Sequence, residues 1–231
     1  MRSTQHPTEP PPEGPSWSAG KDITFGGLSD RGTGYMAYSE RVGPSVLLLH
    51  DAYGLLPSVR SLTDRFVAAG FTALAVDLYE GRTAESADAA GALAAGLDIA
   101  DTMKRLSAAA EHLSGNWHPR LGVVGFSTGA SLATMLARAV EVDSTVVYYG
   151  GGAGLERSWD ARPLLGHFAG RDDFEPASSA LKAIDSLAEA EAFSYDAAHG
   201  FANEDLSDRY QRSAAELALE RTLEELHYQL S

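Results

Sequence analysis

Short apolar runs, bounded by glycine, proline or polar residues, recur along the chain and predict buried strands. These runs cover residues 45–50, 72–78, 121–126, 144–149 and 163–169, with a weaker sixth run at 192–195. Residues 23–26 and 35–40 are candidates for further, antiparallel strands at the start of the sheet.

The segments between these runs predict helices, over residues 59–69, 87–113, 128–140, 177–188 and 208–230. In the first of them, Val59, Leu62, Phe66 and Val67 form an apolar face before Gly70 ends the helix. The second is rich in alanine, and we expect a break near Gly91 or Gly96. Alternating strands and helices require a mainly parallel sheet covered on both faces. The pattern therefore predicts a doubly wound α/β fold with about seven or eight strands.

The chain has 231 residues, which is long enough for one domain with a sizeable core. Residues 1–18 are rich in proline and cannot bury enough apolar surface to fold, so we expect a flexible tail before a domain spanning 19–231. The tail has no apolar segment typical of a signal peptide, and no apolar run is long enough to span a membrane. We therefore expect a cytoplasmic protein.

Charge and cysteine content exclude several classes of function. The net charge of −14 disfavours nucleic acid as a partner, because the chain has no basic cluster to neutralise phosphates. The chain contains no cysteine, which excludes a disulfide scaffold, a thiolate zinc site and a cysteine nucleophile. We expect a small-molecule substrate and a monomer or small homo-oligomer.

A G-F-S-T-G string at residues 125–129 lies between a predicted strand and a predicted helix. Chance supplies such a string in roughly one comparable chain in five, and its alternative interpretation is a glycine-rich turn. Its position matches the tight strand-to-helix turn that exposes a serine nucleophile beside the N-terminus of a helix. The context therefore predicts Ser127 as a nucleophile.

An acid and a base follow in the chain order that this fold requires. Asp172 comes after the run at 163–169, and His199 comes after the run at 192–195. His199 is expected to take the proton of Ser127, while the acid orients its ring. The other histidines lie in the tail, on predicted helices, before a proline or inside a strand: His6, His112, His227, His118 and His167. Asp173 remains the alternative acid, and the two neighbours are expected to point in different directions.

An acyl-transfer site also needs two N–H groups to stabilise an oxyanion. One is expected from Thr128, which directly follows the nucleophile. The loop after the run at 45–50 is expected to supply the other, and Ala52 is the candidate.

Together these strings resemble the dienelactone hydrolase family of small α/β-hydrolases, over roughly residues 46–199. The matching strings are L-L-L-H-D-A-Y-G at 47–54, V-D-L-Y-E-G-R at 76–82, G-F-S-T-G at 125–129, Y-Y-G at 148–150, G-R-D-D-F-E-P at 170–176 and A-H-G-F-A-N at 198–203. The resemblance implies hydrolysis of enol-lactones and small esters through an acyl-enzyme, without a metal or an organic cofactor. It also favours Asp172 over Asp173.

The chain departs from the family pattern at three positions. Ser127 stands where the best-known members have cysteine, and Asp51 stands where they have glutamate. Because a serine hydroxyl is less acidic than a thiol, Ser127 depends more on His199, and Asp51 is either an auxiliary catalytic residue or a support for the oxyanion loop. Arg82 matches one of two arginines that bind a substrate carboxylate, whereas Asn203 replaces the other. A neutral small ester or lactone is therefore expected.

Aromatic residues near these motifs are candidates for the wall of the substrate site: Tyr53, Tyr79, Tyr148 and Phe201. With Arg82 and Asn203 they complete the expected substrate contacts, although buried aromatic residues beside a sheet are more often part of the core. The rival functions are an acyltransferase or peptidase on the same fold, and an inactive α/β-hydrolase that binds a ligand.

Overall fold

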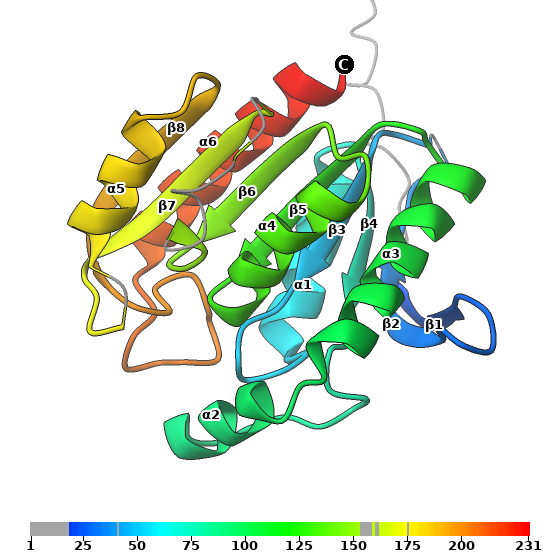
Figure 1. Cartoon of the computed structure of the whole chain (residues 1–231), viewed down its shortest axis with the longest axis horizontal. Coiled ribbons are helices and arrows are strands. Elements are labelled where there is room, and N and C mark those ends of the chain that lie inside the picture. Colours follow the sequence, from blue (N-terminus) through cyan, green and yellow to red (C-terminus); the bar gives the residue numbers. More distant parts are fainter. Residues whose placement is uncertain (1–18, 41, 153–158, 160–161, 175) are drawn as a thin grey trace, which may run out of the picture.

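The computed structural model describes residues 19–40, 42–152, 159, 162–174 and 176–231. The predicted tail at 1–18 lies outside them. In chain order the strands are β1 (Lys21–Phe25), β2 (Gly32–Ala37), β3 (Ser45–Leu49), β4 (Thr72–Val76), β5 (Leu121–Phe126), β6 (Ser144–Tyr148), β7 (Leu164–Arg171) and β8 (Ala190–Ala198). They form an eight-stranded sheet of order β1-β2-β4-β3-β5-β6-β7-β8 (Figure 1). The strands from β3 to β8 run parallel, and β1 and β2 add an antiparallel edge.

Helices cover both faces of the sheet (Figure 1). The helices are α1 (Pro57–Ala68), α2 (Ala87–Ala95), α3 (Ile99–Asn116), α4 (Thr128–Ala139), α5 (Ala177–Asp185) and α6 (Arg212–Leu230). Successive residues of β3 point to opposite faces of the sheet. Val46 and Leu48 pack in the core formed with α1 and α6. Leu47 and Leu49 pack in the core formed with α3 and α4. A third cluster packs α5 against β7. This double coverage explains why the strands read as continuous apolar runs.

The predicted α/β fold is therefore confirmed, with differences at the ends of elements. The alanine-rich segment breaks at Gly96, and the side chain of Asp98 then caps α3 by accepting a hydrogen bond from the Asp101 N–H at 3.0 Å. Strand β8 is longer than the predicted run at 192–195, because pairing with β7 continues beyond its apolar part. Helix α6 begins at Arg212 rather than at residue 208.

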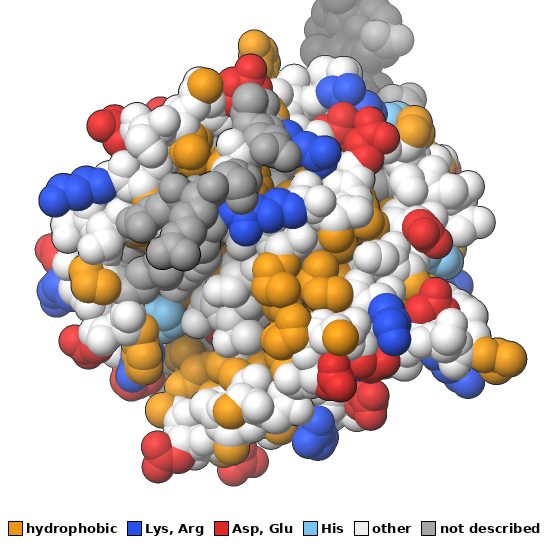
Figure 2. Space-filling view, viewed as in Figure 1, with side chains coloured by type: hydrophobic (Ala, Val, Ile, Leu, Met, Phe, Trp, Pro, Cys, Tyr) orange, Lys and Arg blue, Asp and Glu red, His pale blue; other side chains and the backbone are white. Residues whose placement is uncertain are grey.

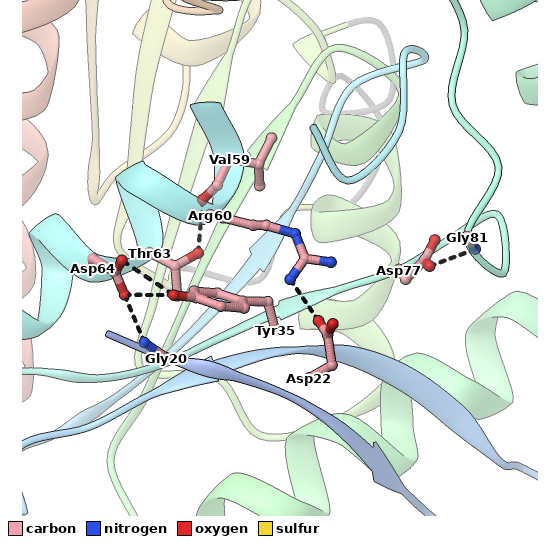
Figure 3. A network of polar contacts seen from close by, with 9 residues as sticks. All are labelled: Gly20, Asp22, Tyr35, Val59, Arg60, Thr63, Asp64, Asp77 and Gly81. Carbon is pink, nitrogen blue, oxygen red and sulfur yellow. Dashed lines mark hydrogen bonds and ion pairs between the residues drawn. The ribbon is translucent and has the colours of Figure 1, made fainter. Parts of the chain in front are cut away.

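Polar contacts join α1 to the antiparallel edge of the sheet (Figure 3). The Tyr35 hydroxyl donates to the Asp64 carboxylate at 3.1 Å, and the Gly20 N–H donates to the same group at 3.2 Å. Arg60 lies over the Tyr35 ring and pairs with Asp22 at 2.5 Å. These contacts hold the helix that follows the β3 loop in a fixed place.

The carboxyl ends of the parallel strands meet at one edge of the sheet, so the loops after β3, β5, β7 and β8 lie close together. Figure 1 shows α2 by itself below this edge, apart from the layers that cover the sheet. Within the described ranges, no helix has the length and apolar character needed to cross a bilayer.

Candidate active site

Ser127 occupies a strained turn between β5 and α4. Its φ of 49° is positive, a region that non-glycine residues rarely adopt, and it is the N-cap residue of α4. Its N–H donates to the Tyr148 carbonyl at 2.9 Å, which fixes the turn against β6. The side chain therefore projects beyond the sheet edge, at the positive end of the α4 dipole.

Three glycines make this turn possible by close backbone packing. A Cβ at Gly125 would overlap Gly129, and one at Gly129 would overlap the Leu49 carbonyl. A Cβ at Gly150 would lie 2.7 Å from the Ser127 carbonyl oxygen. The first two glycines belong to the G-F-S-T-G string, whereas Gly150 ends the Y-Y-G string and is a further requirement of the turn.

The structure brings Ser127, His199 and Asp172 together in one chain of contacts. Ser127 Oγ lies 2.8 Å from His199 Nε2, and His199 Nδ1 lies 2.8 Å from Asp172 Oδ2. Because a carboxylate only accepts hydrogen bonds, Nδ1 carries the proton and Nε2 accepts from the serine hydroxyl. The arrangement suits proton transfer from Ser127 to His199.

Of the two neighbouring acids, only Asp172 reaches the histidine. Its side chain is 1% exposed, and its second oxygen accepts a hydrogen bond from the Phe174 N–H at 2.8 Å. Asp173 points to solvent and is exposed. The Phe174 ring then covers His199, with 4.8 Å between the ring centroids.

The two expected oxyanion donors lie beside Ser127. Thr128 is the first residue of α4, so its N–H has no partner within the helix. Ala52 lies in the loop after β3, and both residues line the same cavity as Ser127 and His199.

Asp51, next to Ala52, is a buried carboxylate with both oxygens in hydrogen bonds. Oδ1 accepts from the Tyr53 N–H at 2.9 Å, and Oδ2 accepts from the Asn203 side-chain amide at 2.8 Å. Burial raises the pKa of Asp51, and these two hydrogen bonds oppose that rise. His50 also holds this loop. Its Nε2 accepts a hydrogen bond from the Leu78 N–H at 3.0 Å, so the proton of the ring is on Nδ1, which donates to the Asp51 carbonyl at 2.7 Å.

The cavity next to Ser127 has a volume of about 230 Å³. Ala87, Ala90, Gly91 and Ala94 of α2 form one wall, at the i, i+3, i+4, i+7 spacing of a single helix face. Phe174, Leu206 and Arg209 also line the cavity. Figure 2 shows apolar side chains gathered over α2 at the lower edge of the molecule. None of these seven residues is expected from the sequence to contact substrate. Phe174 belongs to the G-R-D-D-F-E-P string, whereas the other six lie outside the matching strings.

The residues expected to contact substrate fall into two groups. Tyr53 lines the cavity, whereas the other expected residues lie outside its lining: Tyr79, Arg82, Tyr148, Phe201 and Asn203. Arg82 is exposed, and its Nε donates to the Tyr79 carbonyl at 3.1 Å.

Burial corrects three of these expectations, since Tyr79, Tyr148 and Phe201 are each at most 2% exposed. Tyr148 is 2% exposed and contacts Thr222 of α6 through its hydroxyl at 2.6 Å. Phe201 is fully buried and packs against Tyr149, whose ring also contacts His199. Tyr148 and Phe201 belong to the core on the α6 side of the sheet, so they support the site and do not line the cavity.

A model of the dienelactone hydrolase family matches residues 33–230, nearly the whole described domain. The chain belongs to the dienelactone hydrolase family. The resemblance inferred from the sequence motifs is thereby confirmed.

Two relatives of this chain are distant from it in sequence. It is 32% identical to Protein usf of Aquifex pyrophilus over 128 residues, which cover 51% of this chain and 55% of that protein. The chain thus spans about half the length of that relative. It is 28% identical to the carboxymethylenebutenolidase of Pseudomonas putida over 201 residues, covering 78% of this chain and 84% of the relative.

Solved structures share the fold at lower identity. A dienelactone hydrolase-like promiscuous phosphotriesterase from metagenomic libraries superposes with a TM-score of 0.76 at 18% identity, covering 92% of this chain and 98% of that one. An esterase of Pyrococcus furiosus gives a TM-score of 0.64 at 16% identity, covering 96% and 100%. These likenesses concern the fold alone.

Proposed function

We propose that this protein is a serine hydrolase that cleaves small carboxylic esters or lactones through an acyl-enzyme. The observation that carries the proposal is the pair of 2.8 Å contacts that link Ser127 to His199 and His199 to Asp172. The cavity beside them gives a substrate carbonyl access to Ser127.

The chemistry follows from this geometry. His199 Nε2 takes the hydroxyl proton as Ser127 Oγ attacks the ester carbonyl, and the N–H groups of Ala52 and Thr128 stabilise the oxyanion. Collapse of the tetrahedral intermediate transfers the proton from His199 to the leaving alkoxide and leaves an acyl group on Ser127. His199 then activates water, which releases the acid and restores the serine.

Neutral esters and lactones are the proposed substrate class. Most of the cavity wall consists of alanine, glycine, leucine and aromatic side chains, and its size suits a short acyl group. The name of the Pseudomonas putida relative refers to a butenolide, which is a cyclic ester. When a lactone is cleaved, the leaving alkoxide stays attached to the acyl group. Asp51 is proposed as a support of the oxyanion loop, as its hydrogen bonds to Tyr53 and Asn203 suggest.

Hydrolysis of p-nitrophenyl acetate and butyrate tests the proposal. Ser127→Ala is expected to lower kcat by on the order of 10³-fold or more, since the nucleophile is lost. Asp172→Asn should damage kcat at least about ten-fold more than Asp173→Asn, which equals about 1.4 kcal/mol in the barrier. Unchanged activity in Ser127→Ala would overturn the assignment of the nucleophile, and a larger effect of Asp173→Asn would overturn that of the acid.

A further inference from the structure

Asn203 joins two segments that are far apart in the sequence. Its amide donates to Asp51 Oδ2 at 2.8 Å, across 152 residues of chain. Its side-chain oxygen accepts from the Ser58 hydroxyl at 3.1 Å and from the Asp205 N–H at 3.0 Å. The residue is 5% exposed, and its contact with Asp51 is buried. Asn203 thus ties the β3 loop to the start of α1 and to the loop that carries His199.

The contact with Asp51 bears directly on the backbone of Ala52. Asp51 Oδ1 accepts from the Tyr53 N–H at 2.9 Å, and the Asp51 carbonyl accepts from the Gly54 N–H at 3.3 Å. These two contacts enclose Ala52 in a tight turn, which sets the direction of its N–H. The orientation of the Asp51 carboxylate therefore determines the shape of this loop.

The hydrogen bond from Asn203 favours the ionised form of Asp51 and holds its side chain in this orientation. Burial in this place favours the neutral acid, and the hydrogen bond from Asn203 opposes this effect more strongly than the one from Tyr53. Removal of the amide would leave one buried oxygen without its donor, so the carboxylate would turn or take up a proton.

From these contacts we infer that Asn203 is a positioning residue: through Asp51 it holds the Ala52 N–H in place for the oxyanion formed at Ser127. The inference rests on the proposed hydrolase function and deepens it. Because the donor is used most strongly in the transition state, its displacement lowers kcat and leaves KM nearly constant.

A swap of the two side chains separates this role from simple packing. Asp51→Asn alone places two amides face to face, and Asn203→Asp alone places two carboxylates face to face. In the double variant, the amide at position 51 donates to the carboxylate at position 203. The remaining oxygens still accept from the N–H of Tyr53 and from Ser58, so every hydrogen bond is retained.

The experiment compares kcat and KM for p-nitrophenyl acetate in six proteins: wild type, Asn203→Leu, both single exchange variants, the double variant and Ser58→Ala. Asn203→Leu and each single exchange should lower kcat by on the order of 10–100-fold, below the cost of losing an oxyanion donor outright, with KM within about two-fold. The double variant should recover at least about ten-fold over either single exchange. Ser58→Ala, which leaves the contact with Asp51 intact, should stay within about three-fold of wild type.

The inference is overturned if the double variant is no faster than the single exchanges, or if Ser58→Ala loses as much kcat as Asn203→Leu. It is also overturned if Asn203→Leu folds and keeps the wild-type kcat. The exchange pair still decides the question if the leucine variant does not fold. A different result would show that the hydrolase proposal itself is wrong. In that case Ser127→Ala would retain activity, and all of these variants would have the same kcat.

Discussion

The ring of Phe174 lies 4.8 Å from the ring of His199, although the Phe174 residue itself is 69% exposed. The backbone N–H of the same residue donates to Asp172 Oδ1 at 2.8 Å. Phe174 thus orients the acid through its backbone and covers the base with its side chain. An exposed aromatic residue in this place acts on the site rather than on the core.

Phe174→Ala is expected to lower kcat/KM by roughly 3–10-fold, because a contact between aromatic rings contributes about 0.5–1.5 kcal/mol. The N–H that holds Asp172 remains, so the contacts among Ser127, His199 and Asp172 are expected to stay in place. Steady-state hydrolysis of p-nitrophenyl acetate measures the effect. Leu28→Ala, which removes a fully exposed side chain that does not line the cavity, should change nothing. Equal losses in both variants would contradict a specific role for Phe174.

Substitutions in α2 are expected to change the length of acyl chain that the enzyme accepts. Gly91 lines the cavity, and a Cβ at this position would meet no atom within 4 Å, so the space in front of it is open. Gly91→Leu would fill part of this space. It should lower the ratio of kcat/KM for the hexanoate ester to that for the acetate ester by about ten-fold, since each methylene in a pocket contributes about 1–3 kcal/mol.

Ala92→Leu is the matched control for this measurement. Ala92 is exposed and lies outside the cavity lining, one position further along the same helix. Its substitution should leave the chain-length preference unchanged. If both leucine variants shift the preference alike, α2 acts through its overall stability and not as a wall of the cavity.

Gly150→Ala is expected to damage both folding and activity. The added Cβ would lie 2.7 Å from the Ser127 carbonyl oxygen and 2.9 Å from its Cα, where the backbone has no room to move. Overpacking of this kind costs about 1–3 kcal/mol of unfolding free energy. Denaturant unfolding gives that value, and kcat should fall in the same variant.

Gly115→Ala is expected to change the free energy of unfolding in the opposite direction. Gly115 lies in α3, is exposed, and an added Cβ would meet no atom within 4 Å. Its substitution should stabilise the protein by about 0.5–1 kcal/mol, because alanine favours the helix. A Gly150→Ala variant as stable and active as wild type would show that the turn at Ser127 tolerates the extra atom.

A buried histidine gives the stability of the fold a defined pH dependence. His167 is fully buried on β7, with Nδ1 2.8 Å from the Tyr195 hydroxyl and Nε2 3.0 Å from Thr222 Oγ1. Burial, and secondarily the charge of Arg221, lower the pKa of His167 to about 3. Between pH 6.5 and about 3 the unfolded chain therefore binds a proton that the folded protein does not.

The contribution of His167 to the unfolding free energy should thus fall as the pH drops below 6.5, by about 1.4 kcal/mol per pH unit. His167→Gln cannot titrate, so the difference in unfolding free energy between wild type and this variant should shrink with that slope on acidification. Denaturant unfolding from pH 7 to pH 4.5 measures it. A difference that stays constant over this range would contradict the lowered pKa.

Local sequence patterns are sufficient to predict the strands, the sheet type and the loops that carry Ser127, Asp172 and His199. Each of these depends on residues near one another in the chain: an apolar run for a strand, and glycines around Ser127 for the turn. The parallel sheet then brings the loops after β5, β7 and β8 to one edge. For this reason the sequence alone predicts that Ser127, Asp172 and His199 lie together.

Local sequence patterns do not predict side-chain contacts between segments that are far apart in the chain. Asn203 is four residues after His199 in the sequence, and this spacing predicts a contact with substrate. In the structure its amide instead donates to Asp51 in a different loop. Tyr148 shares a face of β6 with Val146, and that face packs on α1 and α6 rather than toward the cavity. Arg209 lies in a loop with neither periodicity nor a motif, and it reaches the cavity wall only through the folded shape.

Covalent labelling of the full-length protein with a small organophosphonate ester tests the central claim most directly. The serine that attacks the phosphorus keeps the adduct, and mass spectrometry of the peptides locates it. The account predicts one adduct, on Ser127, formed together with loss of esterase activity and absent from Ser127→Ala and from protein in which His199 is replaced by alanine. An adduct on another serine, accompanied by the same loss of activity, would contradict it.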